Sequence, residues 1–153
     1  MTSYKRPLLS ALAFLLSLTA AATAAGEDVT VYKTPWCGCC HMWAEAVKRA
    51  GYQVTTVDLE NLSQVRNQTG VPSEMEGCHV AVVEGYFLEG HVPLEAVSKL
   101  LAERPSIAGI AVPGMPQGSL GMGDDPAATY EVYAVPRDAS GSPSVFYRSG
   151  NQG

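Results

Sequence analysis

The chain has 153 residues, of which 46% are hydrophobic and 16% are charged. This length suits a single domain, or one domain with an extension, and leaves too few residues for two independent cores. The formal net charge is −5 and no cluster of Lys and Arg is present, which argues against a nucleic-acid partner, while the apolar fraction excludes a disordered chain.

The first 25 residues have the pattern of a secretory signal peptide. Lys5 and Arg6 precede an apolar run over residues 8–21, and the small residues 22–25 follow it. This order of basic, apolar and small residues predicts export with cleavage at the end of the segment. A retained membrane anchor is the alternative, because the apolar run is of borderline length for crossing a bilayer. We expect residues 1–25 to be removed, which leaves a soluble mature protein with no membrane contact.

The residues from 26 to 104 predict alternating strands and helices. Alternating β-branched residues are typical of strands, and an apolar stripe such as that containing Trp43 and Val47 is typical of a helix. Glu84-Gly85 is a tight-turn signal between two strands. In chain order the pattern predicts a strand over 29–33, a helix that follows the first cysteines and stops at Gly51, a strand over 53–58, a helix over 62–69, strands over 79–83 and 86–89, and a helix over 93–104, that is, β-α-β-α-β-β-α.

The composition changes after the last of these helices. Residues 105–126 are rich in Pro and Gly and have little periodicity, which predicts a loop. A last hairpin follows, with strands over 130–135 and 145–148. We therefore expect an α/β domain over residues 26–104 and a C-terminal loop and hairpin extension over residues 105–153.

Four cysteines carry the strongest functional signal. Two structural disulfides are the ordinary interpretation for an exported protein, but three of the four lie within four residues, and the neighbours Cys39 and Cys40 do not readily bridge each other. Cys37 and Cys40 instead form a C-x-x-C motif at the start of a helix, where the helix dipole and free N–H groups stabilise a thiolate. A strand, a C-x-x-C motif and a helix in this order are the thioredoxin arrangement.

In that arrangement Cys78, at the start of the third strand, faces the helix end that carries the other cysteines. Four sulfurs then converge, from Cys37, Cys39, Cys40 and Cys78, which predicts a metal site more than an exchange catalyst, because Cys39 would compete in a two-cysteine cycle. Without metal, we expect some of these thiols to be protonated or oxidised, most readily as Cys37–Cys40. A tetrahedral Zn²⁺ is one candidate. The diverging side chains of Cys39 and Cys40 favour instead several bridged Cu(I) ions, which prefer thiolate and thioether ligands.

Met115 and Met122 are further candidate ligands. They bracket the Pro/Gly-rich loop, which can fold back and place their thioethers over the cysteines. Ordinary packing is the alternative for both side chains.

The three histidines give weaker signals. His79 directly follows Cys78, and neighbouring side chains of a strand point to opposite faces, so His79 is the weaker candidate ligand of the two. We expect His91 to hydrogen-bond backbone, and His41 to be exposed on the first helical turn, close enough to tune the site.

Four motifs in order resemble those of the CopG-type copper-resistance proteins and span nearly the whole mature chain. They are Cys37-Gly-Cys-Cys-x-x-Trp43, Cys78-His79, Glu89-Gly-His-Val-Pro93 and Pro113-Gly-Met-Pro-x-Gly-Ser-x-Gly-Met122. The resemblance implies an exported, thioredoxin-like protein of Gram-negative bacteria, whose C-terminal extension helps to bind metal. It also implies a cysteine-bridged copper cluster and a role in interconverting Cu(I) and Cu(II). Leu120 departs from the pattern, because such proteins often carry proline there, but the change removes no ligand.

Together these features predict a periplasmic copper-binding protein with redox handling of Cu(I) and Cu(II) as its activity in copper resistance. Two alternatives stay open. One is a thiol-disulfide oxidoreductase that uses Cys37 and Cys40, and the other is a passive copper buffer or chaperone that delivers copper to a periplasmic efflux system. We expect a monomer whose partners are copper ions.

Overall fold

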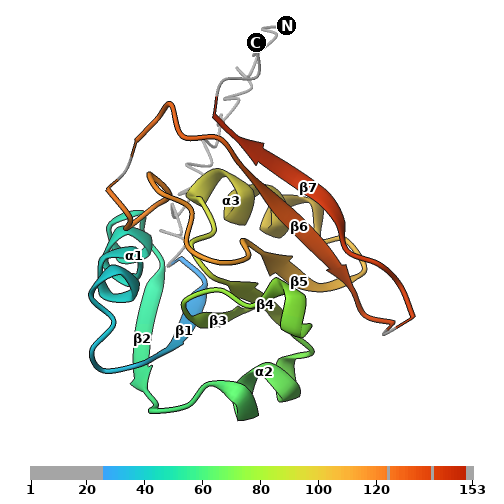
Figure 1. The fold of residues 1–153 in the computed structure, drawn as a ribbon, viewed down its shortest axis with the longest axis horizontal. Helices are drawn as coiled ribbons and strands as arrows, with labels where there is room; N and C mark the ends of the chain where they lie inside the picture. The colour runs from blue at the N-terminus through green and yellow to red at the C-terminus, as the bar shows by residue number, and fades with distance from the viewer. Residues whose placement is uncertain (1–25, 124, 139, 151–153) are drawn as a thin grey trace, which may run out of the picture.

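The computed structural model describes residues 26–123, 125–138 and 140–150. One seven-stranded sheet runs through this part of the chain, with the strand order β2-β1-β3-β4-β5-β6-β7 (Figure 1). In chain order the elements are β1 (Asp28–Lys33), α1 (Gly38–Arg49), β2 (Gln53–Asp58), α2 (Ser63–Thr69), the 3₁₀ turn η1 (Ser73–Met75), β3 (Val80–Val83), β4 (Tyr86–Glu89), α3 (Leu94–Glu103), β5 (Ile107–Ala111), β6 (Tyr130–Pro136) and β7 (Ser144–Ser149).

The elements from β1 to α3 follow the predicted order β-α-β-α-β-β-α, apart from the added turn η1. β1 pairs in parallel with β2 and antiparallel with β3, and β4 is antiparallel to β3. β5 runs parallel to β4, and β6 and β7 continue the sheet as an antiparallel hairpin. The protein is therefore a mixed α/β protein whose C-terminal strands extend the sheet of its N-terminal part.

Alternating strand residues form a separate core on each face of the sheet. On one face, Trp43 of α1 and Leu100 of α3 pack in a cluster with strand residues such as Leu88. On the other face, Val65 of α2 lies in a second cluster with Phe87. This packing fixes α1 against the central strands, with its N-terminal end beside the start of β3 (Figure 1).

The predicted turn residues have the backbone conformations that their turns require. Glu84 and Gly85, between β3 and β4, have φ angles of 48° and 78°, as in a two-residue hairpin turn. Gly70 ends α2 with a left-handed φ of 81°. The predicted hairpin between β3 and β4 and the predicted end of α2 at Gly70 are therefore confirmed.

β5 lies within residues 105–126, which the sequence predicts as a loop, and that prediction is wrong for Ile107–Ala111. The strand is short and has Gly109 at its centre, so it lacks the alternation that marks a strand in a sequence. Packing explains the glycine, because a Cβ on Gly109 would overlap the carbonyl oxygen and the ring of Phe87 on the neighbouring β4.

We expect Gly109→Ala to destabilise the protein by about 1–3 kcal/mol, because the added methyl group meets Phe87 in a packed sheet. Gly38→Ala is the matched control, since a Cβ at this first residue of α1 meets no atom within 4 Å. Urea unfolding of wild type and the two variants measures the difference. Equal midpoints for all three proteins would contradict the close packing of β4 on β5.

The predicted signal peptide, residues 1–25, lies outside the described residues. Among the described helices, none combines the length and the apolar character needed to cross a bilayer. The strands of the predicted last hairpin are confirmed as β6 and β7, although Ala139 in their connecting turn is outside the described residues.

Candidate metal centre

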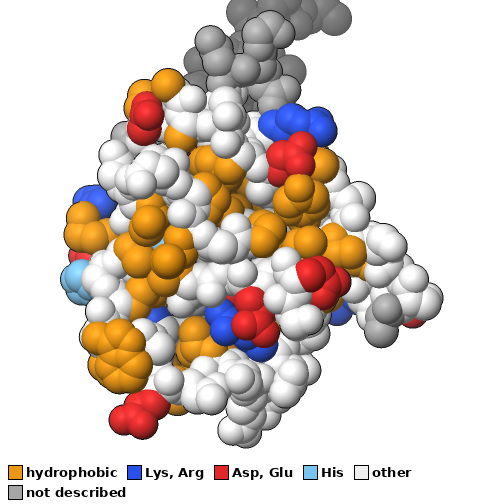
Figure 2. Space-filling view, viewed as in Figure 1, with side chains coloured by type: hydrophobic (Ala, Val, Ile, Leu, Met, Phe, Trp, Pro, Cys, Tyr) orange, Lys and Arg blue, Asp and Glu red, His pale blue; other side chains and the backbone are white. Residues whose placement is uncertain are grey.

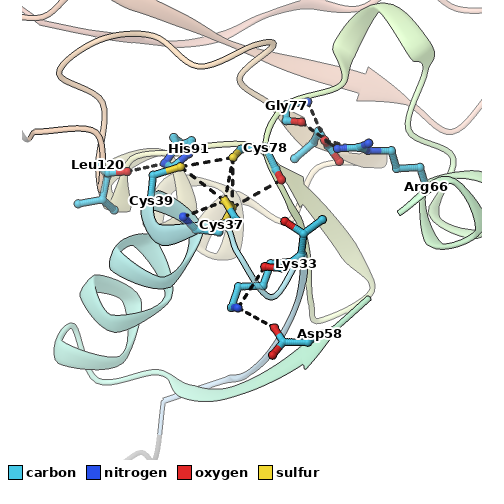
Figure 3. The surroundings of a disulfide bond; sticks show 12 residues. Lys33, Cys37, Cys39, Asp58, Arg66, Gly77, Cys78, His91 and Leu120 are labelled. Carbon is cyan, nitrogen blue, oxygen red and sulfur yellow. Dashed lines mark hydrogen bonds and ion pairs between the residues drawn. A yellow bond between two sulfur atoms is a disulfide. The ribbon is translucent and has the colours of Figure 1, made fainter. Parts of the chain in front are cut away.

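The four cysteines meet at the N-terminal end of α1, where Figure 3 labels Cys37, Cys39 and Cys78. Cys37, Cys39 and Cys40 come from its N-cap and first turn, and Cys78 comes from the segment just before β3. Their Sγ atoms all lie within 4.8 Å of one another, and the Sγ atom of Cys78 is 3.1 Å from that of Cys37 and 3.1 Å from that of Cys40. The convergence of four sulfurs predicted from the sequence is therefore present.

Cys37 caps α1 and forms a disulfide with Cys40. The backbone N–H of Cys40 donates to the Sγ atom of Cys37 at 3.3 Å, which is the capping contact at the helix N-terminus. This is the pair that the sequence predicts to oxidise first. Cys39 and Cys78 are free, half-buried thiols with Sγ atoms 3.4 Å apart. The centre thus combines a two-electron disulfide with two thiols that touch it.

The thiol of Cys78 has a strongly shifted pKa. Burial first, and then the neighbouring Cys39, raise the pKa of Cys78 to about 12, although Arg66 lowers it. Cys78 is therefore a neutral thiol near pH 7 in the metal-free protein, which avoids crowding of anionic sulfurs. Because a metal ligand must be the thiolate, metal binding here should release a proton.

A buried ion pair holds the segment that carries Cys78 (Figure 3). The Oε1 atom of Glu89, which is fully buried in β4, accepts from Arg66 Nη2 at 2.7 Å and from the Gly77 N–H at 2.7 Å. Arg66 Nη2 also donates to the Gly77 carbonyl at 2.9 Å. Both backbone polar groups of Gly77 are therefore fixed immediately before Cys78.

Arg66 and Glu89 are not predicted from the sequence to be parts of this centre. The available signal is Glu89 itself, an acidic residue at the end of the apolar run 86–88, because a carboxylate is rarely buried without a partner. No local pattern points to Arg66, since the pair joins α2 to β4 across 23 positions of the chain.

One end of the loop between β5 and β6 lies beside the Cys78 segment. Gly114 pairs with Gly77 in an isolated parallel bridge, and the Gly114 N–H donates to the Glu76 carbonyl at 2.9 Å. Met115 is the next residue and is 58% exposed. The backbone of Met115 therefore lies close to the segment that carries Cys78.

The other end of this loop lies on the first turn of α1. A Cβ on Gly121, whose φ is 82°, would be 2.9 Å from the Cys39 carbonyl oxygen and 2.8 Å from the Trp43 backbone nitrogen. Only glycine permits this approach. Met122 follows directly and is half-buried. The chain next to Met115 and Met122 thus contacts both cysteine-bearing segments, in agreement with the predicted folding back of the loop.

Large hydrophobic side chains are exposed around the cysteines. Trp36, which precedes Cys37, is 71% exposed, and Met42 of α1 is 53% exposed. Figure 2 shows hydrophobic side chains gathered on the surface on the α1 side of the molecule. Cys37, Cys39 and Cys78 are half-buried, and the cysteine cluster is therefore bordered by apolar surface.

Two of the three histidines are fully buried next to the centre. The ring centroid of His79 is 4.5 Å from that of Trp43 and 5.2 Å from that of His91, and burial lowers the pKa of His79 to about 3. Nδ1 of His91 lies 2.8 Å from the carbonyl oxygen of Leu120, so the predicted hydrogen bond of His91 to backbone is confirmed. His41 is exposed on α1, as predicted.

Comparison with known proteins gives a family match over part of the chain. A protein-family model described as "Protein of unknown function, DUF411" matches residues 75–122, the range that contains Cys78 and the loop with both candidate methionines. No curated protein matches the chain.

Two solved structures, titled "Copper resistance protein copG- Form 1" and "Copper resistance protein copG- Form 2", are each 39% identical in sequence to this chain, with a TM-score of 0.72. The match covers 98% of each of those chains, and 81% and 80% of this one. At this identity, over nearly the full length of the relatives, the chain belongs to the CopG family of copper-resistance proteins.

Proposed function

We propose that this is a periplasmic protein that holds copper through Cys37, Cys39, Cys40 and Cys78 and interconverts Cu(I) and Cu(II) in copper resistance. The observation that carries the proposal is the set of four Sγ atoms within 4.8 Å of one another. The titles of the two similar structures support copper as the metal. Residues 1–25 would act as the signal peptide for export to the periplasm, and copper ions would be the partners of the mature protein.

We further propose that residues 26–104 form a thioredoxin-like domain and that residues 105–153 are an extension that contributes to the metal site. The sheet order β2-β1-β3-β4, in which β3 is antiparallel to the other three strands, supports the first part. The contacts of the loop glycines with the Cys39 and Cys78 segments support the second part.

The donor set favours copper over the alternative, zinc. Cu(I) prefers thiolates and thioethers, and Cys39 and Cys40 are chain neighbours whose sulfurs suit bridging of several ions better than one tetrahedral Zn²⁺. Several thiolates within 4.8 Å repel one another, and bound cations offset that repulsion. We therefore expect more than one copper ion per chain.

Cys37 and Cys40 also give the centre a source of electrons. As a dithiolate, the pair loses two electrons when the S–S bond forms, and two Cu(II) ions accept one electron each and become Cu(I). Cys39 and Cys78 are outside the disulfide and remain available as thiolate ligands for the Cu(I) ions. Protons from any protonated thiol pass to solvent.

The disulfide also favours a second candidate function, a thiol-disulfide oxidoreductase that uses Cys37 and Cys40. A C-x-x-C pair at a helix N-terminus is the site of such enzymes. However, the Sγ atom of Cys78 is 3.1 Å from both sulfurs and that of Cys39 is 3.5 Å from Cys37, so two further thiols would intercept a mixed disulfide. The third candidate, a passive buffer or chaperone for an efflux system, would bind copper without changing its oxidation state.

Anaerobic addition of Cu(II) to the fully reduced protein separates these functions. The proposal predicts that each pair of thiols lost accompanies two Cu(I) ions formed, with disulfide between Cys37 and Cys40. In the double variant Cys37→Ser with Cys40→Ser, Cu(II) reduction should become much slower. Binding of copper with no loss of thiols would favour the buffer. Rapid reduction of a protein disulfide by the metal-free Cys39→Ser variant would favour the oxidoreductase.

Replacing both loop methionines should weaken copper binding without unfolding the protein. We expect Met115→Leu with Met122→Leu to lower the Cu(I) affinity by about 10-fold, or to speed air oxidation of bound Cu(I), because two soft ligands are lost while side-chain volume is kept. Met75→Leu is the control, since Met75 packs against the core beside α2. Competition with a Cu(I) chelator measures the affinity. Unchanged affinity and oxidation rate in the double variant would assign both side chains to packing.

A further inference from the structure

We infer that His91 and His79 form an imidazole site for a copper ion next to the four cysteines, in which Nε2 of His91 binds the metal. This inference rests on the proposed function and adds nitrogen ligands to a centre whose other donors are sulfur. Imidazole is a suitable ligand for copper in either oxidation state.

The hydrogen bond of His91 fixes its tautomer. Nδ1 of His91 lies 2.8 Å from the carbonyl oxygen of Leu120 (Figure 3). Because a carbonyl oxygen only accepts, Nδ1 carries the proton, and in a neutral ring Nε2 then has a free lone pair. Burial lowers the pKa of His91, which keeps the ring neutral. Metal-binding histidines have the same arrangement, in which the second ring nitrogen donates to a carbonyl or carboxylate.

That lone pair lacks a partner within the described part of the chain. Both histidines are 0% exposed, and neither Nε2 of His91 nor either ring nitrogen of His79 has a hydrogen-bond partner among the described residues. An unpaired buried polar atom costs about 1–3 kcal/mol. Three such atoms in two adjacent rings therefore call for a bound species, and a metal ion or a buried water are the candidates.

The two rings are adjacent to the segments that carry the cysteines. His79 directly follows Cys78, and the rings of His79 and His91 are nearly perpendicular, with an interplanar angle of 86° and centroids 5.2 Å apart. The Gly90 N–H donates to the His79 carbonyl at 2.8 Å, which fixes the two histidine segments side by side. Leu120 connects His91 to the loop that also contacts the Cys39 turn.

The test compares one variant at each of the three histidines of the chain. His91→Asn places an amide N–H near the position of Nδ1, which keeps the bond to the Leu120 carbonyl, and removes Nε2. His79→Leu removes both ring nitrogens. His41→Asn is the matched control, because His41 is exposed on α1. X-ray absorption of the copper-loaded proteins detects imidazole ligands by their outer-shell scattering and sulfur ligands by the first shell.

We expect imidazole scattering in wild type and in His41→Asn. In His91→Asn and in His79→Leu the imidazole scattering should decrease, and in His91→Asn the copper affinity should also fall at least about 10-fold, while sulfur scattering persists. A sulfur-only spectrum in copper-loaded wild type, or an imidazole signal that only His41→Asn removes, would overturn this inference and leave the four-cysteine site intact. Failure of wild type to bind copper at all would overturn the proposed function and this inference with it.

Unfolding of the metal-free proteins gives a second readout that does not depend on loading. If the ring nitrogens of His79 are metal ligands, they have no partner in the metal-free protein. His79→Leu then removes unpaired polar atoms from the core, and the metal-free variant should unfold at a higher temperature than wild type. A lower unfolding temperature would show that the ring is held by a structural contact such as a buried water, and would overturn its role as a ligand.

Discussion

Cys78→Ser is expected to lower the copper content to about half of the wild-type value or less, although Cys78 is remote from the other cysteines in the sequence. The Sγ atom of Cys78 touches all three other sulfurs, at 3.1 Å from Cys37, 3.4 Å from Cys39 and 3.1 Å from Cys40. A serine hydroxyl is a hard donor that does not bridge Cu(I). Elemental analysis of copper per chain after anaerobic loading measures the effect.

The control for this prediction is Met42→Ser, which removes an exposed sulfur from α1 at a site outside the cluster. It should load copper like wild type. Circular dichroism of the metal-free Cys78→Ser protein should also match wild type, because serine is close to cysteine in size. Full copper loading of Cys78→Ser would show that the four-cysteine site is wrong.

Glu89→Leu is expected to destabilise the protein by about 3 kcal/mol or more, because it removes the buried carboxylate that pairs with the guanidinium of Arg66 and leaves the half-exposed Glu76 as its carboxylate partner among the described residues. It also removes the acceptor of the Gly77 N–H. Because Gly77 precedes Cys78, the variant should bind copper more weakly although every cysteine is present. Urea unfolding of the metal-free protein and a Cu(I) competition assay measure the two effects.

Two further variants distinguish the loss of this ion pair from a general effect of removing a carboxylate on stability. Glu103→Leu breaks the exposed pair of Lys99 and Glu103 on α3 and should change the stability by at most about 0.5 kcal/mol. Arg66→Leu combined with Glu89→Leu should recover part of the loss, since no unpaired charge stays buried. Equal stability of Glu89→Leu and Glu103→Leu would contradict the proposed support of the Cys78 segment.

The order of the helices and strands up to α3 was predictable, apart from the turn η1, because each of them carries a local signal. The alternation in β1, the stripe of α1 and the Glu84-Gly85 turn are all encoded by neighbouring residues. β5 was not predictable, because its centre is the glycine that packing against Phe87 requires, and that requirement exists only once β4 and β5 are paired.

The candidate site likewise has residues that the sequence predicts and residues that it does not. The three cysteines at the start of α1 are marked by their spacing, and Cys78 follows from the order of the elements. The pair Arg66 and Glu89 joins two elements that are distant in sequence, so no local pattern reveals it. The lone pair of His91 depends on the contact of its ring with Leu120, which is 29 positions away in the chain.

Copper binding by the four cysteines can be tested directly. The most direct test is X-ray absorption at the copper edge, together with elemental analysis, on the reduced mature protein after loading with excess Cu(I) and removal of unbound metal. We expect more than one copper ion per chain, a first shell dominated by sulfur, and copper–copper scattering from bridged ions. A single metal ion per chain, or copper with no sulfur in its first shell, would contradict a copper cluster held by the four cysteines.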